Sequence, residues 1–256
     1  MGSSRLRLLA AAIALVLAAY FTYEAVEAPE NQLFGKTLYA GAPSAREVAL
    51  TFDDGPNPPY TDRILDVLAA EHVHATFFVV GRAAAAYPDT LRRIASDGNA
   101  IGNHTWDHEH MIVDSPAGIR SELTRTSAAI ERITGIKTDI MRPPYGARDF
   151  AVIDQAHKLG YRVVMWSVPL PDDWEQPGER TIAKRVTDNV TAGSIIVLHD
   201  GNRGILCGRD RGTAPSDCNR SQEIPATREI IDTLRAKGFR FVTIPEMIGP
   251  AGAAPR

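Results

Sequence analysis

The chain has 256 residues, of which 44% are hydrophobic and 23% charged, and its formal net charge is −3. A chain of this size and composition is ordinary for one globular domain, which can bury its own core without a metal or a disulfide. The small net charge and the lack of a long Lys/Arg run exclude nucleic acid as the expected partner, because phosphate binding needs a basic surface. Glycans stay open as substrates, since sugars are recognised by hydrogen bonds and stacking.

Residues 1–28 are predicted to be an export signal. Two arginines precede an apolar run from Leu8 to about Tyr23, and acidic residues begin at Glu24. A positive flank before a short apolar run directs the chain across a membrane and keeps the flank in the cytoplasm. One interpretation is an uncleaved signal-anchor, which holds the protein in the cell membrane facing outward or into the periplasm. A signal peptide cleaved near Ala28, which leaves a secreted protein, and a helix buried in the domain are the alternatives.

The rest of the chain is predicted to be one domain over residues 46–248, with a linker or short lead-in at 29–45 and a flexible tail at 249–256. Short apolar runs alternate with amphipathic segments that have helical spacing. Strands are predicted at 47–52, 75–80, 99–104, 139–144, 162–167, 194–200 and 239–244. Strands that alternate with helices favour a parallel sheet covered by helices, either an open doubly wound sheet or a barrel.

Polar residues suited to chemistry follow the predicted strands at their carboxyl ends. They are Asp53 and Asp54, His104, Arg142, Trp166 and His199. In a parallel sheet or barrel these ends share one edge, and active sites are built there. The sequence therefore predicts a site that draws on five strand ends.

Two histidines and an acid predict a metal site. His104 and His108, in "HTWDH", are four residues apart, so on a turn of helix both imidazoles would face one side. A carboxylate from "DDG", Asp53 or Asp54, would complete a set of two His and one Asp, which leaves an open position on a divalent metal. The other carboxylate would then stay ionised beside the cation and accept a proton from water.

Other polar residues have weaker signals. Cys207 and Cys218 favour a disulfide in an exported protein, with two free thiols as the alternative. Asp200 is equally suited to capping a turn and to joining the site. His110 does not share the spacing of the histidine pair and is not expected to take part.

Four motifs, "TFDDG", "HTWDH", "RPPYG" and "LHD", occur in this order, and with them the chain resembles the polysaccharide deacetylases of carbohydrate esterase family 4. The resemblance runs from about Arg46 to Ile248. It implies a distorted (β/α)7-type barrel with parallel strands and an active site at their carboxyl ends. It also implies hydrolysis of N-acetyl groups from an N-acetylhexosamine polymer, such as peptidoglycan or a chitin-like glycan, with release of acetate.

The resemblance assigns the base and the metal ligands. Asp53 would be the general base that activates water, and the guanidinium of Arg142 would buttress it. Asp54, His104 and His108 would hold a divalent cation, usually zinc, with cobalt or another divalent ion as a substitute.

The resemblance also assigns the groups around the substrate. The backbone N–H of Tyr145 would help to hold the oxyanion of the tetrahedral intermediate. His199 would be the general acid that protonates the leaving amine. Leu198 would line the pocket for the acetyl methyl group.

One segment departs from the family pattern. Family members carry an Asp shortly after "WSV" that orients the acid histidine, whereas this chain reads "WSVPLPDDW", with Pro169 and Leu170 at that place. Asp172 or Asp173 is expected to take over this role, and Asp173 is preferred. Trp174 is expected to form a wall of the substrate groove.

Two alternative functions remain on sequence grounds. An O-acetyl esterase that acts on xylan would have the same fold and metal site, and a non-catalytic glycan-binding module would keep only the groove. The chain is expected to act as a monomer, with a glycan polymer and, through its N-terminal segment, a membrane as partners.

Overall fold

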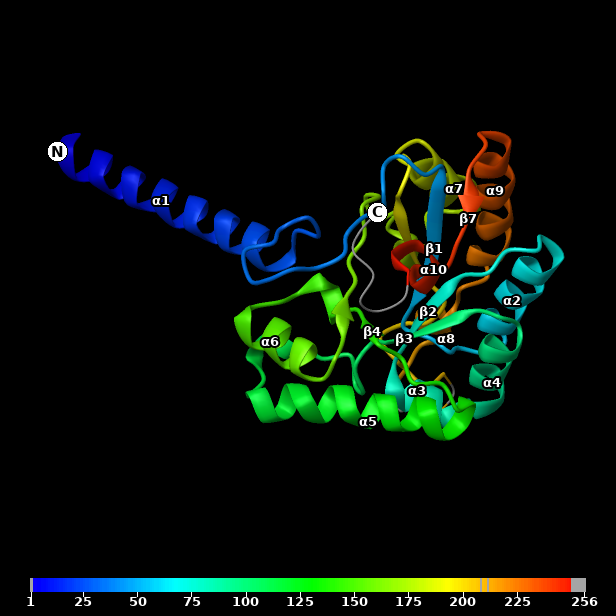
Figure 1. The fold of residues 1–256 in the computed structure, drawn as a ribbon. Coiled ribbons are helices and arrows are strands. Elements are labelled where there is room, and N and C mark those ends of the chain that lie inside the picture. Colours follow the sequence, from blue (N-terminus) through cyan, green and yellow to red (C-terminus); the bar gives the residue numbers. More distant parts are fainter. Residues whose placement is uncertain (1, 208, 211, 250–256) are drawn as a thin grey trace.

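The computed structural model describes residues 2–207, 209–210 and 212–249, and its centre is a parallel sheet (Figure 1). The strands are β1 (Glu47–Asp53), β2 (Thr76–Val79), β3 (Ala100–Asn103), β4 (Ile140–Met141), β5 (Arg162–Val163), β6 (Ile195–His199) and β7 (Arg240–Phe241). They are arranged in the order β5-β4-β3-β2-β1-β6, and β7 pairs with the start of β1. All pairings are parallel, as predicted.

The sheet curls toward a barrel, so the second of the two predicted architectures is confirmed. The chain that follows β5 reaches β6 at the other end of the strand order, where Ser167 N donates to Ile195 O (3.1 Å). Most strands are shorter than predicted. β4 stops at Met141, because Pro143 and Pro144 have no N–H to continue the ladder.

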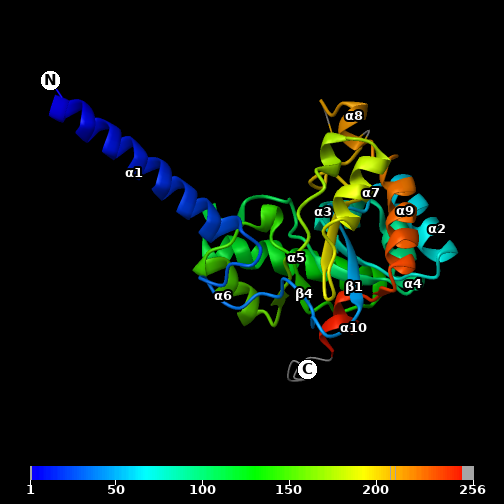
Figure 2. The ribbon, with the colours of Figure 1, turned by 90° about the horizontal axis from the view of Figure 1, so that it is seen from above.

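Helices surround the sheet on its outside (Figures 1 and 2). The helices of the described chain, of which α1 and α8 lie away from the sheet, are α1 (Gly2–Glu27), α2 (Tyr60–Ala70), α3 (Gly81–Ala86), α4 (Pro88–Ser96), α5 (Pro116–Thr134), α6 (Phe150–Lys158), α7 (Glu179–Thr187), α8 (Pro215–Cys218), α9 (Glu223–Ala236) and α10 (Ile244–Ile248), with short 3-10 turns at η1 (Met111–Val113), η2 (Pro144–Gly146) and η3 (Asp173–Glu175). The largest apolar core lies between the sheet and α2, α4, α7 and α9, and includes the stacked rings of Phe52 and Phe77. A second core joins α5 and α6 to β4 and β5.

The helix α1 extends away from the rest of the molecule (Figures 1 and 2). Its apolar side chains, such as Leu8 and Phe21, are exposed, and residues Arg7–Glu27 are long and apolar enough to cross a membrane by length and composition. Residues 29–45 are packed against the domain instead of forming a free linker. Leu38 forms a β-bridge with Val164 in this segment, and Ala40 forms one with Ser194. Of the predicted tail, only Gly249 lies within the described residues.

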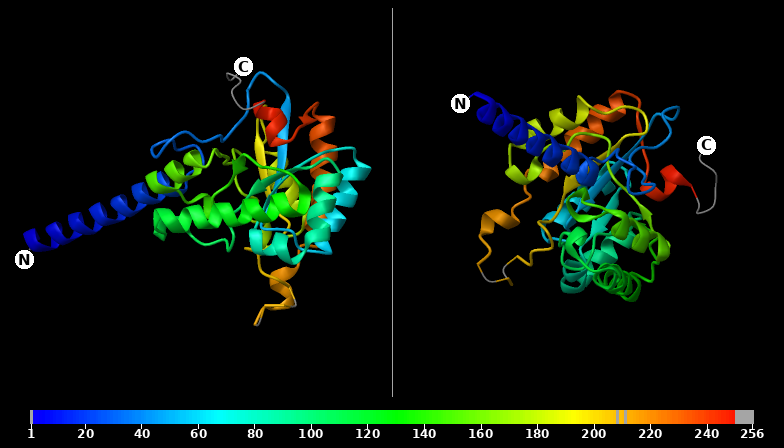
Figure 3. Two further views of the ribbon diagram at one scale, coloured as in Figure 1. Left: turned by 60° about the horizontal axis from the view of Figure 1, so that its bottom comes forward. Right: turned by 90° about the vertical axis from the view of Figure 1, so that its left-hand side faces the viewer.

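A long segment between β6 and α9 contains α8 and extends away from the sheet (Figure 3). Cys207 and Cys218 form a disulfide in this segment, as the sequence favours. The bridge joins residues 11 positions apart, so it constrains this excursion and leaves the barrel strands untouched.

Gly102 in β3 provides a test of core packing. A Cβ at this position would lie 2.3 Å from Cδ1 of Phe78, which is fully buried on β2. We expect Gly102→Ala to destabilise the protein by about 1–3 kcal/mol, because the ring cannot move away without disturbing its own neighbours.

The matched control is Gly118→Ala in α5, where the nearest atom lies 3.4 Å from the added Cβ. This variant should be neutral or up to about 1 kcal/mol more stable, since alanine favours helix over glycine. Denaturant unfolding measures both, and equal effects of the two substitutions would contradict the packing argument.

Candidate active site

The ends of four strands bring the predicted polar residues to one edge of the barrel. Asp53 and His199 are the last residues of β1 and β6, while His104 and Arg142 follow β3 and β4 directly. Since parallel strands share their carboxyl ends, the four side chains converge although up to 146 positions separate them in the chain. Trp166, which follows β5, stands beside them, with its ring centroid 6.0 Å from Cζ of Arg142.

Asp54, His104 and His108 form a buried cluster of donor atoms that lie within 4.8 Å of one another. Asp54 Oδ1 lies 3.4 Å from His104 Nε2 and 3.0 Å from His108 Nε2. Ligand atoms around a tetrahedral divalent cation are about 3.3 Å apart, given metal–ligand distances near 2 Å. Asp54 Oδ1 has no hydrogen-bond partner in the described part of the chain although it is buried. The separations and this unpartnered oxygen therefore fit a bound cation.

The surroundings orient two of these donors, His104 and Asp54. Nδ1 of His104 lies 2.8 Å from the carbonyl oxygen of Arg142, which can only accept a hydrogen bond. The proton is therefore on Nδ1, and Nε2 keeps the lone pair that a metal needs. Oδ2 of Asp54 accepts from the backbone N–H of Arg203 (2.7 Å), which leaves Oδ1 for the cation.

The loop that carries the two histidines differs from the prediction. Residues 104–108 do not form a helical turn, and Thr105 and His108 have positive φ angles of 64° and 60°. The hydroxyl of Thr105 accepts from His108 N (3.1 Å), and Glu122 Oε2 accepts from both N–H groups of residues 106–107 (3.0 Å or less). The prediction of a helical turn was wrong, because these side chains capture the amides that a helix would use, yet the imidazoles still converge.

Asp53 is paired with a buried guanidinium. Its Oδ1 accepts from Nη1 of Arg142 (2.7 Å), and the same nitrogen donates to Thr51 Oγ1 (2.8 Å). Nη2 of Arg142 donates to the carbonyl oxygen of Met165 (3.1 Å), and the ring of Phe78 packs 4.2 Å from Cζ. Burial lowers the pKa of Arg142, while the charge and hydrogen bond of Asp53 act against this effect.

Asp54 has different partners. Burial alone would raise the pKa of its carboxyl, but the neighbouring His108 and His104 outweigh burial and hold the pKa well below its ordinary value. The two adjacent acids therefore have separate partners: a guanidinium lies beside Asp53 and two imidazoles lie beside Asp54.

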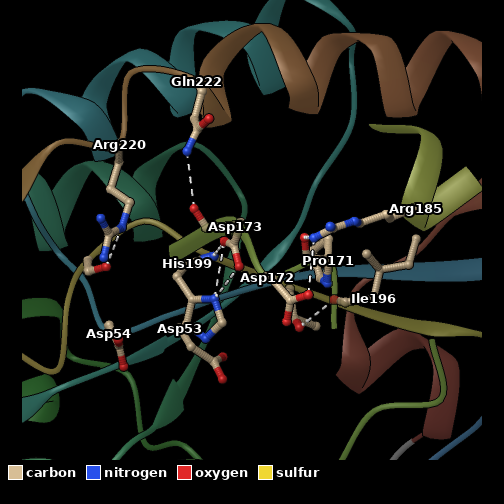
Figure 4. A network of polar contacts seen from close by, with 12 residues as sticks. Asp53, Asp54, Pro171, Asp172, Asp173, Arg185, Ile196, His199, Arg220 and Gln222 are labelled. Atoms are coloured by element: carbon tan, nitrogen blue, oxygen red, sulfur yellow. Dashed lines mark hydrogen bonds and ion pairs between the residues drawn. The ribbon is translucent and has the colours of Figure 1, made fainter. Parts of the chain in front are cut away.

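His199 is held by Asp173, as the sequence predicts, and not by Asp172. Oδ1 of Asp173 lies 2.9 Å from Nδ1 of His199, and its Oδ2 accepts from the backbone N–H of His199 (2.7 Å). Asp172 turns away and pairs with Arg185 (3.1 Å). Figure 4 shows the imidazole between Asp173 and Asp53. Burial acts to lower the pKa of His199, but the charge of Asp173 outweighs it and raises the pKa to about 10.

Asp200 packs against the turn that follows β1. Its Oδ2 accepts from the hydroxyl of Thr61 (2.5 Å), and a Cβ on Gly55 would lie 2.0 Å from the same oxygen. The glycine in "DDG" is therefore required by close approach of this carboxyl. Burial, together with the charges of Asp54 and Asp53, raises the pKa of Asp200 to about 7.

Aromatic rings line the rim of the site. Tyr145 packs edge-on against His108 (centroids 4.8 Å apart) and stacks on His110 (3.8 Å, 9° between planes). His110, which the spacing had set aside, therefore belongs to this rim. Trp174 stands edge-on to His199 at 5.3 Å and is partly exposed, as expected for a wall of a groove.

Leu198 does not reach the site. Its side chain is fully buried in the core between the sheet and the outer helices. Residues i and i+2 of a strand share a face, so Val197 is the neighbour of His199 that faces the same way. The core position of Leu198 does not suit its expected role in the pocket, and strand alternation in "IIVLH" places Val197 on the face of His199.

Comparisons with known proteins agree with this geometry. Residues 40–164 match the family model described as polysaccharide deacetylase. The chain is 35% identical over 82% of its length to a peptidoglycan-N-acetylglucosamine deacetylase of Bacillus cereus, of which 70% is covered. It is 36% identical over 77% of its length to a chitooligosaccharide deacetylase of Azorhizobium caulinodans, of which 92% is covered.

A solved structure shares the fold as well. It is a peptidoglycan N-acetylglucosamine deacetylase in complex with 4-naphthalen-1-yl-N-oxidanyl-benzamide. The alignment covers 82% of this chain and 92% of the other, with a TM-score of 0.73 and 33% identity. With this agreement in sequence and architecture, the chain belongs to the polysaccharide deacetylase family.

Proposed function

We propose that this protein removes N-acetyl groups from a glycan that contains N-acetylhexosamine units, and that it releases acetate. The observation that carries the proposal is the arrangement of Asp53 and His199 beside the metal-site residues Asp54, His104 and His108. A base paired with a guanidinium and an acid paired with a carboxylate suit the two proton transfers of amide hydrolysis. The names of the relatives support peptidoglycan or chitin-like oligosaccharides as the substrate class.

Asp54, His104 and His108 are proposed to hold the cation, and zinc fits this set of two nitrogen donors and one oxygen donor. When bound, such a cation supplies Lewis-acid chemistry, which polarises the acetyl carbonyl and lowers the pKa of water. Cobalt or another divalent ion would serve in the same place.

The chain's own groups then divide the proton transfers. Asp53 accepts the proton of the attacking water, and Arg142 keeps this carboxylate oriented and ionised. The backbone N–H of Tyr145 donates to the oxyanion of the tetrahedral intermediate. His199, protonated because of Asp173, gives a proton to the departing amine of the sugar. Trp174 and the stacked Tyr145 and His110 are proposed to position sugar rings in the groove.

The location of the activity is proposed to be outside the cytoplasm. The unburied apolar helix α1 suits a membrane anchor, and the Cys207–Cys218 disulfide suits an oxidising compartment. We propose that α1 is retained as an anchor, and that the domain acts as a monomer on glycan next to the membrane.

The proposed activity predicts acetate release from peptidoglycan or chitooligosaccharide. We expect a chelator to abolish this release and zinc to restore it, because Asp54, His104 and His108 alone do not polarise the carbonyl. Acetylxylan is the control substrate and should yield little acetate. Acetate from acetylxylan alone would replace the proposal with O-acetyl esterase activity, and no acetate from any of the three glycans would contradict both.

Two substitutions separate the base from the metal ligands. Asp53→Asn is expected to lower kcat by about 10²–10⁴-fold, the usual contribution of a general base, while bound zinc stays at the level of the unsubstituted protein. His104→Ala is expected to lose the zinc itself. Metal analysis and acetate release on the same samples measure both effects. Near-normal turnover of Asp53→Asn would remove Asp53 from the role of base.

The pair of Asp173 and His199 predicts a change in the pH profile. A protonated His199 is needed, so activity falls as the pH rises through its pKa. Asp173→Asn removes the charge that raises this pKa, so the alkaline limb of kcat should move to lower pH by about 1 unit or more.

The neighbouring Asp172→Asn is the matched control, since this carboxylate is half exposed and pairs with Arg185. The alkaline limb of kcat for this variant should lie at the same pH as that of the unsubstituted protein. Equal profiles for the two variants would show that Asp173 does not control the protonation of His199.

A further inference from the structure

Arg148 lies directly after the "RPPYG" motif and is almost completely buried, with 1% of its surface exposed. Its guanidinium has no ion-pair partner among the described residues; it donates only to backbone carbonyl oxygens. Four of these acceptors belong to the end of α1 and the residues that follow it: Val26 (3.3 Å), Ala28 (2.5 Å), Pro29 (3.5 Å) and Asn31 (2.7 Å). The backbone N–H of Arg148 also donates to Val26 O (3.1 Å). We refer to residues 26–31 as the mounting segment.

This arrangement is costly unless every donor is satisfied. A buried charge without a carboxylate partner is tolerated only where polar groups replace its water. Burial lowers the pKa of Arg148, and the charge of Glu30 opposes this effect. Because most of the acceptors come from the mounting segment, the guanidinium depends on that segment to stay where it is.

The fifth acceptor lies in the active-site turn. Nη1 of Arg148 donates to Gly146 O (2.9 Å), next to Tyr145. Tyr145 has φ 60° and Gly146 has φ 70°. A tyrosine adopts positive φ only where its surroundings impose it. One side chain thus bonds to this strained turn and to the mounting segment at once.

The mounting segment has its own internal supports. Asn31 Nδ2 donates to Glu24 O (3.1 Å) in the last turns of α1, and Asn31 Oδ1 accepts from Leu33 N (2.8 Å). The base of α1 therefore runs into the domain through a hydrogen-bonded turn (Figures 1 and 3).

We propose that Arg148 is a positioning residue, which uses the mounting segment to hold the Tyr145–Gly146 turn in its active geometry. This inference rests on the proposed deacetylase activity. The residues between α1 and the barrel are then part of the catalytic apparatus and not a passive connection. A cut after Ala28 would separate two of the four acceptors from the domain.

The test uses the full chain in lipid nanodiscs, with peptidoglycan as substrate. Arg148→Met keeps the length and apolar stem of the side chain but removes its five side-chain hydrogen bonds. We expect kcat to fall at least tenfold, with KM within twofold and zinc content unchanged, because the N–H of Tyr145 acts on the oxyanion and not on the bound ground state. Amide hydrogen exchange should accelerate in 26–31 and in 143–148 together.

Arg162→Met is the matched control. Arg162 also ties a distant segment to the barrel through a carbonyl, that of Gly249 (3.2 Å), but on a part of the fold away from the turn. Its kcat should stay within twofold of that of the unsubstituted chain, and exchange in 143–148 should not change.

Asn31→Ala leaves Arg148 in place and loosens only the mounting segment, so it decides the question if Arg148→Met does not fold. This variant should also lower kcat, and it should accelerate amide hydrogen exchange in 26–31 and in 143–148. Unchanged kcat in either variant, with faster exchange confined to 26–31, would overturn the proposal and leave Arg148 as a structural clamp. If the unsubstituted chain releases no acetate, the proposed function fails. Exchange in 143–148 of Asn31→Ala then decides the coupling, and an unchanged rate overturns it.

Discussion

Two carboxylates next to each other on a buried edge repel strongly when both are ionised, so the site depends on giving each its own partner. The structure places the guanidinium of Arg142 on Asp53 and the two imidazoles on Asp54. This separation suits the proposed roles, in which one acid acts as the base while its neighbour holds a cation. The parallel strand order makes this arrangement feasible, because the ends of β3 and β4 bring His104 and Arg142 to the edge where β1 ends.

The acid side of the site follows the same electrostatic logic. Glu223 is fully buried, and both of its carboxylate oxygens are without hydrogen-bond partners in the described chain. Burial, and then the charge of Asp173, raises the pKa of Glu223 well above its ordinary value. Asp173 provides the negative charge at Nδ1 that keeps His199 protonated.

The sequence predicts the parts of the site that a strand end determines, and misses those that distant contacts determine. Strand ends followed by polar motifs were sufficient to place Asp53, His104 and His199 together. The loop 104–108 was misjudged as a helical turn, because its shape depends on Glu122 on the far side of the following loop. The choice between Asp172 and Asp173 as the partner of His199 likewise depends on a local backbone turn, which no residue pattern specifies.

The hydrogen bonds between Arg148 and the mounting segment limit how far the domain of a membrane-anchored form of the protein can move from the membrane. The 26 residues of α1 span about 39 Å, which exceeds the hydrocarbon thickness of about 30 Å. With the mounting segment bonded to the barrel, no flexible spacer separates the end of this helix from the domain. An enzyme built in this way would sample only a thin layer of glycan at the bilayer surface. It would reach new glycan chains by lateral diffusion of its anchor in the membrane, and not by movement of the domain on a flexible linker.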